Sequence, residues 1–208
     1  MLKLDHLAIG CADLTAGISW LSDRLEQPPL VQAKHQLFGT HNALWRLETD
    51  DYPVYLELIA IDPDAPKPAR ARWFGLDDPA VQARIIKRPA LLTFIVSTQD
   101  FSRAREQMPL DPGAPVFVTR NNLKWHFSLH DDGRLVANGA LPYLIAWEPG
   151  VRPVDNMVSQ NIDLVGMGGQ RLSELEMVFP CSTFSTPLGL EMALKLPGGK
   201  KITFFTGQ

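Results

Sequence analysis

Leu4-Asp5-His6-Leu7-Ala8-Ile9-Gly10-Cys11-Ala12-Asp13-Leu14 is a short apolar segment that ends in an acidic residue suited to a helix start. Leu91-Leu92-Thr93-Phe94-Ile95-Val96-Ser97-Thr98-Gln99-Asp100-Phe101 has the same pattern, and Leu91 lies 87 residues after Leu4. We therefore predict a duplicated unit whose site lies where the two copies meet. The first copy also carries His6 on its opening strand and Glu57 on its closing strand, a pair that could do chemistry.

The composition is that of a globular protein with a real core. The chain has 208 residues, of which 45% are hydrophobic and 21% charged. A net charge of −3 offers no basic field for nucleic acid or an anionic membrane surface. Cys11 and Cys181 have no metal-ligand spacing, and no secretion signal or membrane-spanning run is visible, which favours a cytoplasmic protein with free thiols.

Periodicity and breakers divide the chain into four parts. We predict a first module over 1–63, a connector over 64–89, a second module over 90–149 and a β-rich C-terminal extension over 150–208. Expected strands cover 2–10, 30–36, 42–48, 54–61, 90–98, 115–119, 122–130, 142–148, 161–167, 174–179, 190–196 and 200–206, with helices at 14–26, 77–87 and 100–108. Short helices on mixed or antiparallel sheets indicate an α+β fold.

The sequence resembles the vicinal-oxygen-chelate superfamily, and within it the glyoxalase-like branch. The resemblance rests on Leu4-Asp5-His6-Leu7, Ala12-Asp13-Leu14, the segment 38–44 (FGTHNAL), the segment 55–63 (YLELIAIDP) and the segment 141–147 (LPYLIAW). It implies two paired βαβββ modules that form a cup, often around a divalent metal ion. The resemblance also implies that the first and last strands of each module supply the ligands, which here would be His6 and Glu57.

The second module departs from that pattern. Thr93 stands at the position of His6, and Ala146 aligns best with Glu57. Glu148 has the same strand parity as Ala146 but lies two residues further on, roughly 6.6 Å along the strand. A ring-cleaving dioxygenase site would need two histidines and a carboxylate around iron, and Thr93 in place of the second histidine argues against it unless His126 substitutes.

Further polar residues are candidates for ligand contact. His41 and Asn42 enter a strand after a Gly-Thr turn, where they could contact a ligand or complete the turn. The segment 125–130 (WHFSLH) alternates, so Trp125 lies on one face and His126 on the other. If the apolar face with Trp125 packs on the helices, His126 faces the cup. Otherwise His126 lies on the solvent-exposed face of the sheet.

Two hypotheses follow. The first is a metal-assisted isomerase or lyase for a small oxygen-rich substrate, in which His6 and Glu57 bind one divalent ion and Glu57 and His126 are catalytic, with Glu148 as another candidate proton carrier. The ligand contacts would come from His41, Asn42, Trp125 and Glu148. The second is a metal-free protein of the same fold that binds or sequesters a small molecule. The expected partner is a small molecule, with no nucleic acid or membrane, and the protein would be a monomer or homodimer.

Overall fold

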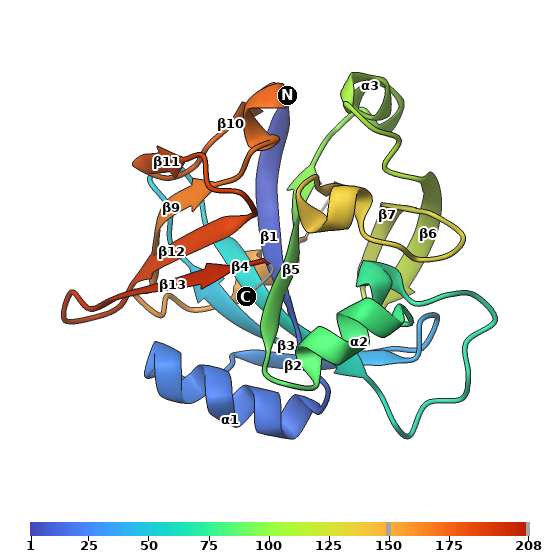
Figure 1. Ribbon diagram of the computed structural model, residues 1–208, viewed down its shortest axis with the longest axis horizontal. Helices are drawn as coiled ribbons and strands as arrows, with labels where there is room; N and C mark the ends of the chain where they lie inside the picture. Colours follow the sequence, from blue (N-terminus) through green and yellow to red (C-terminus); the bar gives the residue numbers. More distant parts are fainter. Residues whose placement is uncertain (149–150, 207–208) are drawn as a thin grey trace.

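Strand β1 (Leu2–Gly10) runs through the middle of the molecule and joins its two halves (Figure 1). The computed structural model describes residues 1–148 and 151–206. The first half continues with α1 (Leu14–Leu25), β2 (Val31–His35), β3 (Thr40–Leu47) and β4 (Val54–Ile61). Asp13 caps α1 as its position suggests, because its carboxylate accepts a hydrogen bond of 2.7 Å from the Ala16 amide.

The second half repeats this order. It contains β5 (Ala90–Ser97), α3 (Phe101–Gln107), β6 (Ala114–Arg120), β7 (Leu123–Leu129) and β8 (Tyr143–Trp147). Between the halves lie a 3-10 turn, η1 (Trp73–Gly75), and a short helix, α2 (Pro79–Ile85), and η2 (Val136–Gly139) precedes β8. The predicted α+β class is therefore confirmed.

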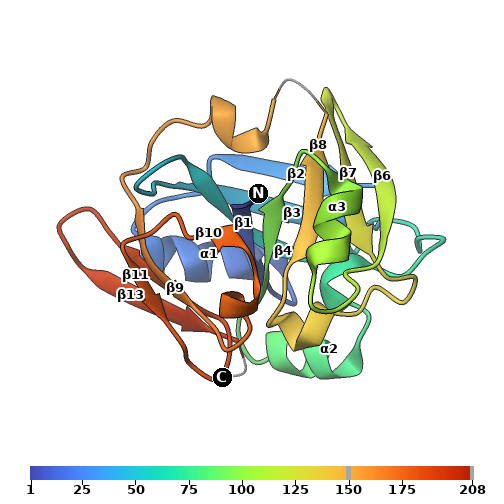
Figure 2. The same cartoon turned by 90° about the horizontal axis from the view of Figure 1, so that it is seen from above.

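One curled sheet contains both modules. Its order is β2-β3-β4-β1-β5-β8-β7-β6, with β1 antiparallel to β5 at the centre (Figures 1 and 2). The pairs His6–Ile95 and Ala8–Thr93 show that positions 87 residues apart are equivalent in the two halves. Helix α1 packs on β3 and β4, while α3 packs on β8, so one face of the sheet is left to line a cup.

The C-terminal part returns to the first module. It contains η3 (Pro153–Asn156), β9 (Asp163–Gly168), η4 (Leu172–Glu174), β10 (Met177–Val178), β11 (Thr183–Ser185), β12 (Glu191–Lys195) and β13 (Lys201–Phe205). Four of these strands form a second sheet in the order β11-β9-β12-β13. Strand β10 pairs with Leu2 and Lys3, extending along β1 the ladder that β4 makes with residues 6–10. The predicted boundary at 149–150 lies outside the described residues.

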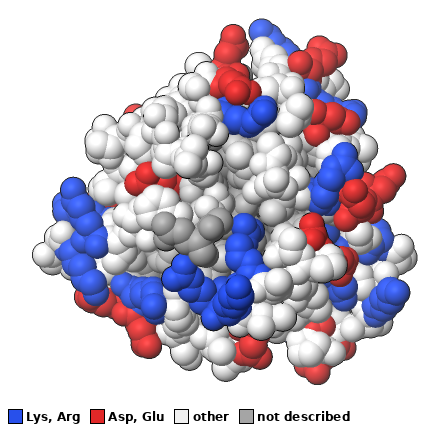
Figure 3. Space-filling model, viewed as in Figure 1, with Lys and Arg blue, Asp and Glu red and all other residues white. Residues whose placement is uncertain are grey.

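Charges of both signs occur on the face drawn in Figure 3, where several basic side chains gather along the lower edge. Within residues 1–148 and 151–206, no helix combines the length and the apolar composition needed to cross a bilayer.

Candidate functional site

A small cavity of about 30 Å³ lies on the inner face of the curled sheet. Its walls are His6, His35, Asn42, Leu44, Tyr55, Glu57, Trp73, Phe74, Arg120, Trp125, Phe127, Ile145, Trp147 and Pro153. A space of this size holds about one or two water molecules. The polar side chains come mainly from the first module, and the second module and the connector supply aromatic rings.

Asp5 and His6 are neighbours in sequence, yet their side chains meet. In the pairing with β5, Leu4 lies opposite Val96 and His6 lies opposite Ile95, which leaves Asp5 as the extra residue of a β-bulge. A bulge re-aims a side chain that regular alternation would send to the other face. The Asp5 carboxylate is fully buried and lies 2.7 Å from His6 Nδ1.

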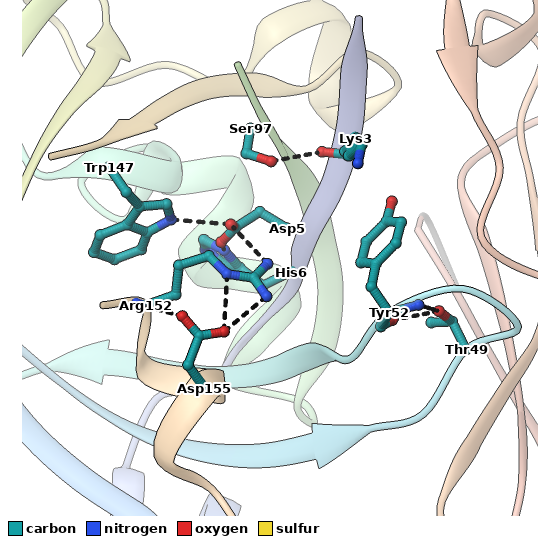
Figure 4. Close-up of polar contacts among 9 residues, drawn as sticks. All are labelled: Lys3, Asp5, His6, Thr49, Tyr52, Ser97, Trp147, Arg152 and Asp155. Carbon is teal, nitrogen blue, oxygen red and sulfur yellow. Dashed lines mark hydrogen bonds and ion pairs between the residues drawn. The ribbon is translucent and has the colours of Figure 1, made fainter. Parts of the chain in front are cut away.

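Two more side chains surround the Asp5 carboxylate. Trp147 Nε1 donates a hydrogen bond of 2.9 Å to Asp5 Oδ2, and the Arg152 guanidinium lies 3.9 Å from the same oxygen (Figure 4). Arg152 also forms an ion pair with Asp155 in η3. Because Asp5 binds Nδ1 of His6, the ring orientation is fixed and Nε2 is directed to the cavity.

Glu57 faces the cup because its neighbour faces the other way. A Cβ atom on Gly17 of α1 would come 3.1 Å from the Leu58 side chain, so Leu58 points toward the helix and Glu57 points inward. Glu57 Oε1 accepts a hydrogen bond of 2.5 Å from the Asn42 amide, and Oε2 lies 3.5 Å from His6 Nε2. The His6 ring stacks on Tyr55 at 4.3 Å.

Burial and pairing act in opposite directions on this pair. Burial alone lowers the pKa of His6, but the Asp5 and Glu57 carboxylates outweigh it, and the pKa is raised. Burial likewise raises the pKa of Glu57, but the contacts with His6 and with the Asn42 amide outweigh it, and the pKa is lowered. Both directions favour a buried ion pair between an imidazolium and a carboxylate.

His35, at the end of β2, is a cavity residue that the sequence did not single out. Its Nε2 accepts hydrogen bonds from Asn42 Nδ2 at 3.0 Å and from Arg120 Nη1 at 3.2 Å. Burial lowers the pKa of His35 to about 4, so the ring is neutral at pH 7. Strand alternation places 31, 33 and 35 on one face, but a lone histidine in a short strand carries no motif that marks it.

Two of the predicted ligand contacts line the cavity and two do not. Asn42 and Trp125 are in its wall. His41 points to the opposite face of β3, where burial lowers its pKa. Glu148 lines a separate surface groove of about 560 Å³ and lies 4.0 Å from Lys124.

His126 is on the far side of β7 from the cavity. Trp125 and Phe127 face inward, and the His126 ring packs against Phe117 at 5.2 Å. The cup is therefore lined by the apolar face of this strand, and the structure does not bring His126 near His6 or Glu57.

The register of β8 corrects the alignment of Ala146 with Glu57. Glu57 pairs with Ala8, and the residue equivalent to Ala8 is Ile95, which pairs with Tyr143. Tyr143 therefore occupies the place of Glu57 in the second module, and its hydroxyl donates to the Arg134 carbonyl at 2.7 Å. Ala146 pairs with His126, on the face turned away from the cavity.

His6 and Glu57 fit a divalent ion as two of its ligands. Two donors about 2.1 Å from a tetrahedral ion are roughly 3.4 Å apart, close to the 3.5 Å between His6 Nε2 and Glu57 Oε2. Over residues 1–148 and 151–206, no group of three or more His, Cys, Asp or Glu side chains is arranged to hold a metal. The other coordination positions would fall to water or to substrate oxygens.

Comparisons with known proteins agree with this architecture. A family profile described as a glyoxalase-like domain matches residues 4–180. No curated protein gives a significant match to the chain. A hypothetical protein from Staphylococcus aureus is similar over 100% of this chain and 87% of its own, with a TM-score of 0.56 and 14% identity.

Methylmalonyl-CoA epimerases also align, but only partially. A variant of the Streptomyces coelicolor enzyme in complex with 2-nitronate-propionyl-CoA covers 72% of this chain and 97% of its own, with a TM-score of 0.47 and 16% identity. The Mycobacterium tuberculosis enzyme covers 71% and 88%, with a TM-score of 0.42 and 18% identity. These scores are too low to carry a functional argument, and the family assignment rests on the domain match. The chain therefore belongs to the glyoxalase-like domain family of the vicinal-oxygen-chelate superfamily.

Proposed function

We propose that the protein is an isomerase- or lyase-type enzyme that moves a proton on a small carbonyl compound, whose reacting end enters the cavity of about 30 Å³ beside His6 and Glu57 while the rest of the compound lies outside it. The observation that carries this proposal is the buried row Asp5–His6–Glu57, with separations of 2.7 Å and 3.5 Å. An acid and a base held side by side in a buried cavity are the groups that proton transfer next to a carbonyl requires.

Glu57 would act as the base. Its lowered pKa keeps it ionised at neutral pH, and Asn42 holds Oε1 so that Oε2 remains directed at the cavity. His6 would supply the positive charge beside the oxygen of the enolate, because Asp5 and Glu57 raise its pKa. Asp5 would act through His6 by fixing its ring.

A divalent ion held by His6 Nε2 and Glu57 Oε2 would polarise the substrate's oxygen atoms as a Lewis acid, and Glu57 would then be a ligand of the ion and not the base. Such an ion and a proton on Nε2 are alternatives, because both use the same nitrogen lone pair. With two protein ligands we expect weak ion binding that substrate oxygens strengthen.

A second candidate is a metal-free binding protein. Rings of Trp73, Trp125, Phe127 and Trp147 are part of the cavity wall, and such a lining suits a small, partly aromatic ligand. A binding protein would bind its ligand without catalysing exchange at carbon.

Hydrogen–deuterium exchange at carbon tests the enzyme proposal without knowledge of the product. Pyruvate and dihydroxyacetone would each be incubated with the protein in D₂O, once with and once without Mn²⁺ or Zn²⁺. The metal would then be removed with a chelator, and the loss of the carbon-bound proton signals would be measured by proton NMR. We expect enzyme-dependent exchange that falls about 10²-fold or more in Glu57→Gln. Glu106→Gln, an exposed carboxylate on α3, is the matched control and should exchange like the wild type.

Equal exchange rates in the wild type and Glu57→Gln would contradict the catalytic role. Elemental analysis of wild type and His6→Ala, purified without chelator, addresses the ion separately. Metal that is present in the wild type and absent from His6→Ala supports the His6–Glu57 ion site.

A further inference from the structure

A groove of about 910 Å³ lies between the two end strands of the curled sheet. One wall is residues 32–37 of β2 and the turn after it, and the other is residues 117–121 of β6 and its turn. His35 and Arg120 line both this groove and the His6–Glu57 cavity. The groove and the cavity therefore adjoin at these two side chains.

Arg120 carries a charge that its protein neighbours do not balance. Its Nη1 donates to His35 Nε2, but His35 is neutral. Among the residues that the structure describes, no carboxylate lies within 4.0 Å of the Arg120 guanidinium, whereas Lys34 in the same groove is 2.7 Å from Asp62. A partly buried guanidinium costs free energy to leave unpaired, and its planar fork matches a carboxylate.

Arg120 is also connected to the reacting end of the site. Hydrogen bonds run from Arg120 to His35 at 3.2 Å, from Asn42 to His35 at 3.0 Å and from Asn42 to Glu57 at 2.5 Å. Arg120 and Glu57 are thus the two ends of one polar row along the cavity wall. An anion bound at Arg120 would therefore lie at one end of this row, with Glu57 at the other.

We propose that the substrate carries a carboxylate, that it reaches the cavity through the groove between β2 and β6, and that Arg120 binds this carboxylate and directs the carbonyl end toward Glu57 and His6. This inference rests on the proposed function for the identity of the reacting end. It makes Arg120 a specificity-determining residue and the substrate class a small oxo-carboxylate. Neutral carbonyl compounds leave the guanidinium unpaired and bind more weakly.

Tryptophan fluorescence measures this binding directly, because Trp73, Trp125 and Trp147 line the cavity. The probes are pyruvate and phenylglyoxylate, each compared with its own neutral amide. We expect each acid to bind about 10- to 100-fold more tightly than its amide, the range of one charge-assisted contact. In Arg120→Gln this preference should disappear, and Arg120→Lys should keep part of it because the charge remains but the fork is lost.

Arg105→Gln is the matched control, since this exposed arginine pairs with Asp111 outside both cavities and its loss should leave the preference intact. Thermal unfolding of Arg120→Gln checks that the variant folds. If no acid in the panel binds more tightly than its amide, or if Arg120→Gln keeps the preference, the inference is wrong.

Titrations in Glu57→Gln separate this inference from the proposed function. A preference for the acid that survives in this variant supports the role of Arg120 whether or not carbon exchange occurs. Exchange that proceeds equally on acids and amides would support the catalytic proposal and overturn the role of Arg120.

Discussion

Replacing Asp5 tests the role of the β-bulge in the site, and two variants are needed. Asp5→Ala leaves His6 Nδ1 and Trp147 Nε1 without an acceptor in a fully buried place. Each lost partner costs about 1–3 kcal/mol, and breaking a buried charged pair costs about 3–5 kcal/mol. We therefore expect a loss of about 4 kcal/mol, which lowers the Tm of a chain this size by roughly 8–16 °C.

Asp5→Asn keeps an oxygen for Trp147 but presents an N–H group to His6 Nδ1. The unfolding free energy should then fall by only about 1–2 kcal/mol. Asn carries no charge, so one of the two carboxylates that raise the pKa of His6 is lost, and the ring favours its neutral form with the proton on Nε2 and Nδ1 as the acceptor. Activity and metal binding should fall sharply in a protein that is still folded.

The assays are urea denaturation for stability and ¹⁵N NMR of the imidazole for the tautomer. Asp5→Asn should show a neutral Nε2–H ring, while in the wild type both ring nitrogens should be protonated. A variant with the wild-type protonation state and a full loss of activity would refute the positioning role of Asp5. Equal losses of unfolding free energy in Asp5→Ala and Asp5→Asn would refute the argument that Asp5→Ala is worse because it leaves two ring N–H groups without an acceptor.

Two further predictions concern the scaffold. Gly139→Ala should lower the unfolding free energy by at least about 3 kcal/mol, because Gly139 has φ +90° and a Cβ would lie 1.9 Å from the Leu92 carbonyl oxygen. Gly198→Ala is the control for backbone strain alone, since Gly198 has φ +86° but no atom within 4 Å of a Cβ. Equal losses of unfolding free energy in the two variants, measured by urea denaturation, would contradict the contact with Leu92. The hydrogen bond from Lys34 lowers the pKa of Asp62 in the folded state. The stability that this contact contributes is therefore present above the unfolded pKa of about 4 and is lost as the pH falls through the folded pKa. Asp62→Asn should make the unfolding free energy depend less on pH in this range, and an unchanged slope would count against the Lys34 contact.

The alternation of side chains made much of the fold and part of the site predictable. The repeat of the segments at Leu4 and Leu91 indicated two equivalent halves, and the family resemblance implied that His6 and Glu57 face the cup, where the structure has them. Parity could not tell which face of β7 lines the cup. Aromatic rings fill the cup, so Trp125 faces inward and His126 does not.

The remaining features depend on register and on contacts between distant strands. A bulge at Asp5 breaks the alternation that sequence reasoning assumes, so the contact between Asp5 and His6 could not be foreseen. Sequence similarity aligned Ala146 with Glu57, whereas the structure puts Tyr143 there, because pairing with β5 sets the register of β8. His35 and Arg120 meet only because the two ends of the sheet curl toward each other across 85 residues.

The pairing of β10 with the start of β1 has a consequence for how the protein is made. β1 can pair with β4 and β5 once residue 97 is available, but Leu2 and Lys3 reach Met177 and Val178 only about 80 residues later. At a synthesis rate of about 5–20 residues per second, that interval lasts roughly 4–16 s. During this time the backbone groups of Leu2 and Lys3 that later meet β10 stay unpaired. The nascent chain is then most open to aggregation and to chaperone binding, and completion of the β1 ladder is a late step in its folding.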